Sequence, residues 1–172
     1  MNRDSRSTTG KTSGVALSIV MLFAFLGVVF AVAFAGAAVT TANLSDWYNN
    51  IAKPELTPAN WVFPIVWNLL FLMMGIAGWL VWRTAGGLNE AGGVLSIFAA
   101  QLMLNFAWSV LFFGLHRPDL ALAEVIVLDL AITATIVGFW WHSKLAALLL
   151  VPYLLWTLFA TWLTAAIWFL NK

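Results

Sequence analysis

Five long apolar runs dominate the chain, and short polar segments separate them. The runs cover residues 15–39, 56–82, 91–115, 120–141 and 145–171, and only the fourth contains charged residues. Each run exceeds the roughly 20 residues that a helix needs to cross a bilayer. The pattern therefore predicts an all-α integral membrane bundle of five transmembrane helices, formed by one domain over residues 15–172.

Most connections between these runs are short. They comprise residues 83–90, 116–119 and 142–144. Connections of this length make successive helices antiparallel neighbours. The exception is the segment 43–60, which contains Trp47, Pro54 and Pro58 and leads into Trp61. A plain hydrophilic connector would not contain so many aromatic and proline residues, so we predict that this segment has a structure of its own.

The composition agrees with a protein whose solvent is lipid. Hydrophobic residues make up 63% of the chain and charged residues 9%, whereas soluble domains carry about a quarter charged residues. The formal net charge of +1 provides no basic surface for nucleic acid. The chain has no cysteine, which excludes disulfides and thiolate chemistry. The sequence predicts a multi-pass membrane protein, although it does not indicate which membrane holds it.

The N-terminal region allows two interpretations. Residues 1–14 are polar and charged without an apolar period, which predicts a disordered tail. The tail and the first run also resemble a cleavable signal peptide, but that run is longer than the usual apolar core of about 7–15 residues. Gly27, Ala31 and Ala35 recur every four residues, a stripe suited to close helix packing. With five spans, the basic residues favour a cytoplasmic N-terminus.

Polar and aromatic residues share one face of the third run. Gln101, Asn105, Trp108 and Phe112 follow one another at intervals of four, three and four residues. Buried amides cost free energy unless they find hydrogen-bond partners. The two amides could therefore bond neighbouring helices, or they could provide a polar anchor inside an aromatic pocket.

Two other runs carry aromatic faces that favour the pocket. These faces contain Trp67, Phe71, Met74 and Gly78 in the second run, and Trp156, Ala160 and Leu163 in the fifth. An aromatic stripe at helical spacing is more often helix packing than a ligand site. Large indoles beside small residues nevertheless leave space between them, which suits a flat apolar ligand.

The fourth run contains the two acids at membrane depth. Glu124 and Asp129 are five residues apart and point about 140° from each other, so they do not form a carboxylate pair for acid–base catalysis. We expect Glu124 to extend toward the interface and Asp129 to use Thr133 as a local partner. A proton relay, a structural hydrogen bond and packing against another subunit all remain open for these acids.

Ordinary catalytic and metal motifs are missing from the sequence. The two histidines, His116 and His142, lie in separate short turns, so no metal site is predicted. No nucleophile–base arrangement or phosphate-binding loop is evident, and no catalytic residue is predicted on this basis.

Three blocks of sequence resemble the translocator protein and tryptophan-rich sensory protein family, TspO/MBR. They are Trp47-Tyr48 through Lys53-Pro54, Pro58 and Trp61 to Trp67; "AQLMLNFAWSVLFFGLHR" at 100–117; and "LLLVPYLLWTLFATWL" at 148–163. The resemblance implies a five-helix bundle whose first connection covers a ligand cavity. The cavity residues that it implies are Tyr48, Pro58, Trp67, Phe71, Asn105, Trp108, Ser109, Trp156, Ala160 and Leu163.

The same resemblance implies a function. Family ligands include porphyrins such as protoporphyrin and haem, sterols and synthetic benzodiazepine-site compounds, which predicts a receptor or transporter with a sensory role and no other cofactor. The alternative is a porphyrin-degrading enzyme that uses light and oxygen, with Trp67 and Trp156 implicated. A homodimer is also expected, with Gly92, Ser96 and Ala100 at the contact. One departure from the family pattern, Glu55-Leu56 after Lys53-Pro54, makes the connection less aromatic.

Overall fold

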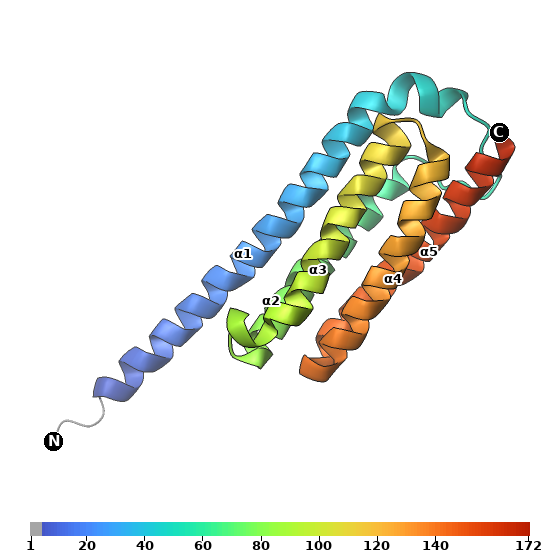
Figure 1. Cartoon of the computed structure of the whole chain (residues 1–172). Coiled ribbons are helices and arrows are strands. Elements are labelled where there is room, and N and C mark those ends of the chain that lie inside the picture. The colour runs from blue at the N-terminus through green and yellow to red at the C-terminus, as the bar shows by residue number, and fades with distance from the viewer. Residues whose placement is uncertain (1–4) are drawn as a thin grey trace.

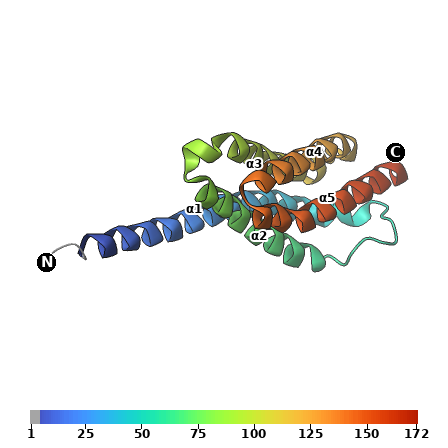
Figure 2. The ribbon, with the colours of Figure 1, turned by 90° about the horizontal axis from the view of Figure 1, so that it is seen from below.

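The computed structural model describes residues 5–172 as a bundle of helices (Figures 1 and 2). Side chains are described from Gly14 onward, except those of Ser45 and Asp46. The helices are α1 (Ser5–Asn43), α2 (Val62–Ala85), α3 (Leu88–Ser109), α4 (Pro118–His142) and α5 (Lys144–Leu170). All five contain a stretch long and apolar enough to cross a membrane, which confirms the predicted fold class.

The helices form a closed ring of neighbours. Helix α1 packs against α2 and α3, α4 packs against α3 and α5, and α2 returns to α5. Two ends of the bundle are named here for later use. The loop end contains residues 44–61, residues 115–117 and Asn171, and the far end contains Gly14, the α2–α3 turn and Ser143 (Figure 1).

Local sequence explains where the helices stop at the far end. Helix α2 ends at Gly86, whose φ of 93° is accessible to glycine and unfavourable for most other residues. The Ser143 hydroxyl accepts a hydrogen bond of 3.3 Å from the Ala146 amide and so caps the start of α5. These caps allow the short turns that the sequence predicts.

Helix α1 begins earlier than the sequence analysis expected. It starts at Ser5, so residues 5–13 have helical backbone although they were assigned to a disordered tail, while residues 1–4 lie outside the described part. No proline interrupts the run from Ser5 to Asn43, so helical hydrogen bonds can continue past the apolar stretch. Figure 1 shows α1 projecting beyond the other helices at the far end. Signal-peptide cleavage and membrane orientation stay predictions.

Glycines allow close contacts between α1 and α2. A Cβ atom added to Gly75 would lie 2.6 Å from Leu26 Cδ2, and one added to Gly78 would lie 2.9 Å from Phe25 Cδ1. Within the described chain the stripe on α1 is not a packing surface, because Gly27 has nothing within 4 Å of its Cβ position. Helix α1 contacts its neighbours through its other face, where Val29 is fully buried.

Two π-helical turns interrupt the helices at the loop end. The turn η1 (Leu44–Tyr48) follows α1, and η2 (Val110–Gly114) follows α3. In η2 the consecutive residues Phe112 and Phe113 are both buried. π-Helical turns occur often at functional sites because the extra residue redirects the side chains around it. Here η2 directs two phenyl rings toward the connection that crosses the loop end.

Candidate ligand-binding site

A buried tyrosine joins the two amides of α3. Asn105 Nδ2 donates to the Tyr153 hydroxyl at 3.1 Å, and that hydroxyl donates to Gln101 Oε1 at 2.9 Å. Tyr153 is fully buried on α5, and Gln101 is 1% exposed. The predicted shared face of α3 is thus correct, and the amides bond a neighbouring helix. Our sequence analysis missed Tyr153 as the partner, although a phenol in mid-membrane must find one.

Aromatic rings line the seam between α2 and α5 beside this triad. The Trp67 ring centroid lies 5.5 Å from that of Phe71 and 6.1 Å from that of Tyr153. Trp156 makes an edge contact of 5.9 Å with Phe63, another residue that sequence reasoning missed. The structure therefore brings three predicted residues, Trp67, Phe71 and Asn105, around Tyr153, and it places Trp156 on the same seam.

A second aromatic cluster lies closer to the connection. Trp108 stacks on Phe112 with ring centroids 4.9 Å apart and planes 12° apart. Tyr48 approaches Phe113 at 5.5 Å, and Leu163 is buried in the same cluster. Trp108 packs against this cluster and also against the core that contains Tyr153. It consequently links the two groups of predicted site residues.

The remaining predicted residues lie in different surroundings. A Cβ atom on Gly36 would lie 3.3 Å from Ser109 Oγ, so Ser109 faces α1. Pro58 and Ala160 are half-buried. The expected space beside Gly78 is filled, because Phe25 and Phe98 occupy it. That correction removes Gly78 from the candidate site and assigns it to helix packing.

Two hydrogen-bond donors at the site have no partner among the described residues. They are Gln101 Nε2 and Trp108 Nε1, and both atoms are buried. An unpaired buried donor costs about 1–3 kcal/mol. Because both donors lie among aromatic rings, the arrangement suits a ligand with a flat apolar body and polar acceptors at its edge.

Contacts to α5 and to the α3–α4 turn hold the connection in place, and a further contact lies within it. The side chain of Asn171 accepts from the Ala52 amide and donates to the Ala52 carbonyl, each at 2.9 Å. Within the connection, Lys53 Nζ lies 4.3 Å from the centroid of the Tyr48 ring. Burial of Tyr48 raises the pKa of its hydroxyl above the usual value. Trp47 stacks on His116 at 4.7 Å. Figure 1 shows the connection reaching the C-terminal end of α5 before it returns to α2.

Comparisons with known proteins identify the family. The model of the TspO/MBR family matches residues 25–169. The chain belongs to the TspO/MBR family. Among its relatives, the "Tryptophan-rich protein TspO" of Archaeoglobus fulgidus is 43% identical over 155 residues, which cover 90% of this chain and 99% of that protein.

Other TspO/MBR relatives carry different names. The human "Translocator protein" is 40% identical over 123 residues, which cover 71% of this chain and 73% of that protein. The "Tryptophan-rich sensory protein" of Cereibacter sphaeroides is 40% identical over 129 residues, which cover 73% of this chain and 79% of that protein. The family resemblance proposed from the sequence is confirmed.

The two intramembrane acids of this TspO/MBR protein differ from expectation. Thr133 donates to the backbone carbonyl of Asp129, whereas the Asp129 carboxylate accepts a hydrogen bond of 2.7 Å from Thr161 on α5. The hydroxyl of a threonine at i+4 readily reaches the helix carbonyl, which explains the difference. Both carboxylate oxygens of Glu124 are buried without a partner among described residues, so this side chain does not extend to the interface.

Residues of the types that bind metals are dispersed in this TspO/MBR fold. Within the part of the chain that the structure describes, His, Asp and Glu form no group of three or more that could hold a metal ion. The candidate site itself consists of aromatic rings, two amides and a phenol.

Proposed function

We propose that this protein binds a porphyrin, such as protoporphyrin or haem, at the candidate site between mid-bundle and the loop end, and that binding has a sensory or regulatory role. The observation that carries the proposal is the pair of unpartnered buried donors, Gln101 Nε2 and Trp108 Nε1, set among aromatic rings. A porphyrin offers a flat apolar macrocycle and carboxylate groups that can accept hydrogen bonds. The names of the relatives, "Translocator protein" and "Tryptophan-rich sensory protein", support a role of this kind without naming a ligand.

The macrocycle is expected to lie against the α2–α5 seam, between Trp67 and Trp156. Both indoles are half-buried, so each retains a face that a ligand could cover. Contact between aromatic rings contributes about 0.5–1.5 kcal/mol beyond the burial of area. Tyr48, Leu163, Ala160 and Pro58 would then contact the ligand from the connection and α5, and Phe71 and Ser109 would support the walls.

Single-ring substitutions test this placement. Trp67→Phe and Trp156→Phe keep an aromatic ring while reducing its area, so we expect binding to weaken about twofold to tenfold, or by up to about 1.4 kcal/mol. Trp141→Phe is the matched control, because Trp141 is 82% exposed at the other end of α4. The absorbance change of protoporphyrin during titration gives the same signal for all variants, whatever their tryptophan content. Equal affinities for the wild type and the three variants would contradict a site on this seam.

Trp108→Phe tests the role of the unpartnered donor separately. This change keeps a ring against Phe112 and removes Nε1, so we expect weaker binding of protoporphyrin and unchanged binding of its dimethyl ester. The ester keeps the macrocycle but lacks the anionic carboxylates, which accept charge-assisted hydrogen bonds more strongly than neutral groups do. An equal loss for both ligands would show that Trp108 acts through packing alone.

A second candidate function is photooxidative degradation of the porphyrin, with dioxygen as the oxidant. Trp67 and Trp156 favour it because they occupy the same seam and each contacts a further aromatic ring, Tyr153 or Phe63. The excited macrocycle would supply the reactivity, and the two indoles would be the protein groups nearest to it. Illumination of the complex in air should then destroy porphyrin absorbance faster than illumination of a Trp67→Phe complex saturated with ligand. Equal rates, or equal loss without oxygen, would leave binding as the function.

A further inference from the structure

A second pocket lies at the far end, away from the candidate porphyrin site. It has a volume of about 660 Å³ and opens between the first turns of the α1 span and the last turns of α2. Its α1 wall includes Val15, Leu17 and Ile19, and its α2 wall includes Trp79, Trp82 and Arg83. Pockets of roughly 300–1,000 Å³ are typical of small-molecule sites. The size therefore suffices for a headgroup and the first part of an acyl chain.

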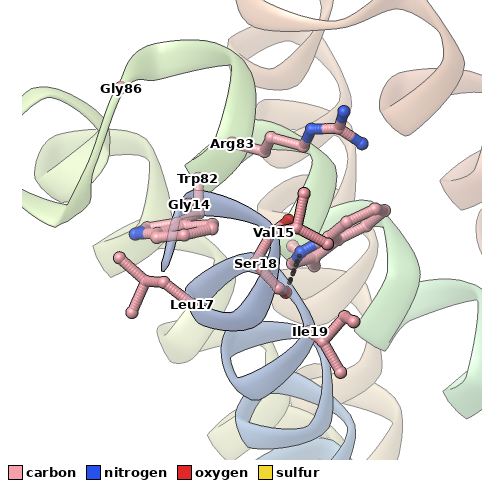
Figure 3. A pocket seen from close by; sticks show the side chains of 9 residues that line it. Gly14, Val15, Leu17, Ser18, Ile19, Trp82, Arg83 and Gly86 are labelled. Atoms are coloured by element: carbon pink, nitrogen blue, oxygen red, sulfur yellow. Dashed lines mark hydrogen bonds between the residues drawn. The ribbon is translucent and has the colours of Figure 1, made fainter. Parts of the chain in front are cut away.

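A tryptophan fixes the two walls of this pocket to each other. Trp79 Nε1 donates to the backbone carbonyl of Ser18 at 2.9 Å. The guanidinium carbon of Arg83 lies 5.3 Å from the centroid of the Trp79 ring, within range of a cation–π contact. In Figure 3 the Trp82 indole lies beside Leu17 at one side of the pocket, and the Arg83 guanidinium lies at the other. Among the described residues that line the pocket, Arg83 is the one cation, and it lies at the edge.

Arg83 has an unbalanced charge in the described part of the chain. Among the described residues, the salt bridge joins Arg117 to Asp119 at the loop end. No described carboxylate lies within salt-bridge distance of Arg83. Arg83 is exposed, so its guanidinium can reach an external anion. Guanidinium groups bind phosphate oxygens in a bidentate manner that lysine cannot reproduce.

The depth of the pocket indicates the source of that anion. The apolar run of α1 begins at Val15, after polar and charged residues, and the α2 span ends at Ala85, so the pocket lies where apolar spans meet the polar headgroup region. Tryptophan and arginine are common anchors at this level. Val15 and Ile19 continue from the pocket along the apolar surface of α1, and both are at least half exposed. A lipid can place its phosphate at Arg83 and its chain along these residues at the same time.

We propose that the far-end pocket binds an anionic phospholipid, with the phosphate paired to Arg83 and the acyl chain against Val15 and Ile19. This site is independent of the proposed porphyrin site. It would fix the junction of α1 and α2 to one leaflet of the membrane.

Native mass spectrometry of the full chain in detergent, with added phosphatidylglycerol or phosphatidylcholine, tests the proposal. We expect the wild type to retain phosphatidylglycerol in preference to phosphatidylcholine. Arg83→Gln should reduce that retention about fivefold, the factor that corresponds to about 1 kcal/mol for one basic residue at an anionic surface. Lys144→Gln is the matched control, because Lys144 lies at the same end and its Nζ is 5.6 Å from the centroid of the Trp140 ring.

A pocket-filling variant separates a built site from general surface charge. Val15 is 62% exposed, so Val15→Trp can fill the mouth of the pocket without disturbing the core, and it should also reduce phosphatidylglycerol retention. Millimolar inorganic phosphate should not compete, because it lacks the chain. Equal losses in Arg83→Gln and Lys144→Gln, no effect of Val15→Trp, or full competition by free phosphate would each overturn the proposal.

Discussion

The candidate site and the contact between α1 and α2 are held together in different ways. At the candidate site large rings fill the interior, and a phenol joins two amides across α3 and α5. At the α1–α2 contact glycines let the two helices approach so closely that a methyl group would overlap a neighbour at Gly75 or Gly78. The candidate site leaves buried donors unpaired, whereas the α1–α2 contact uses close backbone approach, which is common between membrane helices.

This difference indicates which part of the bundle can change with a ligand. Close contacts at glycine leave little room for adjustment, so the α1–α2 contact is expected to stay fixed. Rings can change rotamer, and unpaired donors gain a partner when a ligand arrives. The candidate site therefore trades some stability for the capacity to bind.

The largest effect is expected at the glycine contact. Gly75→Val places new atoms against Leu26, whose Cα lies 3.3 Å from the Cβ position and cannot move independently of its helix. Overpacking of this kind costs about 1–3 kcal/mol. The free energy of unfolding in mixed micelles measures it. Gly27→Val is the control, since nothing lies within 4 Å of that Cβ position, and an equal loss in both variants would contradict the close contact.

A smaller loss is expected when the polar triad is broken. Tyr153→Phe leaves Gln101 Oε1 and Asn105 Nδ2 without their shared partner, at a cost of about 0.6–2 kcal/mol. The same unfolding measurement applies. Tyr48→Phe is the matched control, because its described contacts involve the ring. A larger effect of Tyr48→Phe would mean that the triad contributes little.

The attachment of the connection should affect local opening more than global stability. Asn171→Ala removes two hydrogen bonds to Ala52, which should speed amide hydrogen exchange around residue 52 by up to about tenfold. Asn68→Ala is the control, because the Asn68 side chain bonds only Pro64 of its own helix in the described structure. Unchanged exchange in Asn171→Ala would show that other contacts hold the connection.

The smallest effect on the monomer is expected for the outward face of α3. We propose that Gly92, Ser96 and Ala100 form a homodimer contact; Ser96 and Ala100 are exposed, and Gly92 has nothing within 4 Å of its Cβ position. Ser96→Leu should shift the population toward monomer in detergent without lowering the melting temperature. Light scattering coupled to size-exclusion chromatography measures this shift. An unchanged dimer fraction would place the contact on another face.

The sequence predicts some features well because lipid imposes them. A spanning segment must satisfy its own backbone hydrogen bonds, so five apolar runs mean five helices. The shared face of Gln101 and Asn105 follows from helical spacing alone. The family motifs supply the candidate site, whose ligand contacts stay predictions.

Features that depend on how helices rotate against one another were not predictable. Spacing shows that Gly78 shares a face with Trp67, but it does not show that Phe25 of α1 fills the space beside it. Asp129 pairs with Thr161, which is 32 residues away on another helix, although Thr133 is closer in sequence. The composition of residues 5–13 suggests disorder, whereas their backbone extends the α1 helix toward the N-terminus.

The hydrogen bonds of Asn171 have a practical consequence for reporter proteins and affinity tags. Because Asn171 holds Ala52, a fusion placed directly after Lys172 would crowd the connection and could alter ligand entry. A fusion at the start of the chain lies beyond α1, at the opposite end of the bundle (Figure 1). Binding assays on this protein should therefore use N-terminal tags, or a flexible spacer after Lys172.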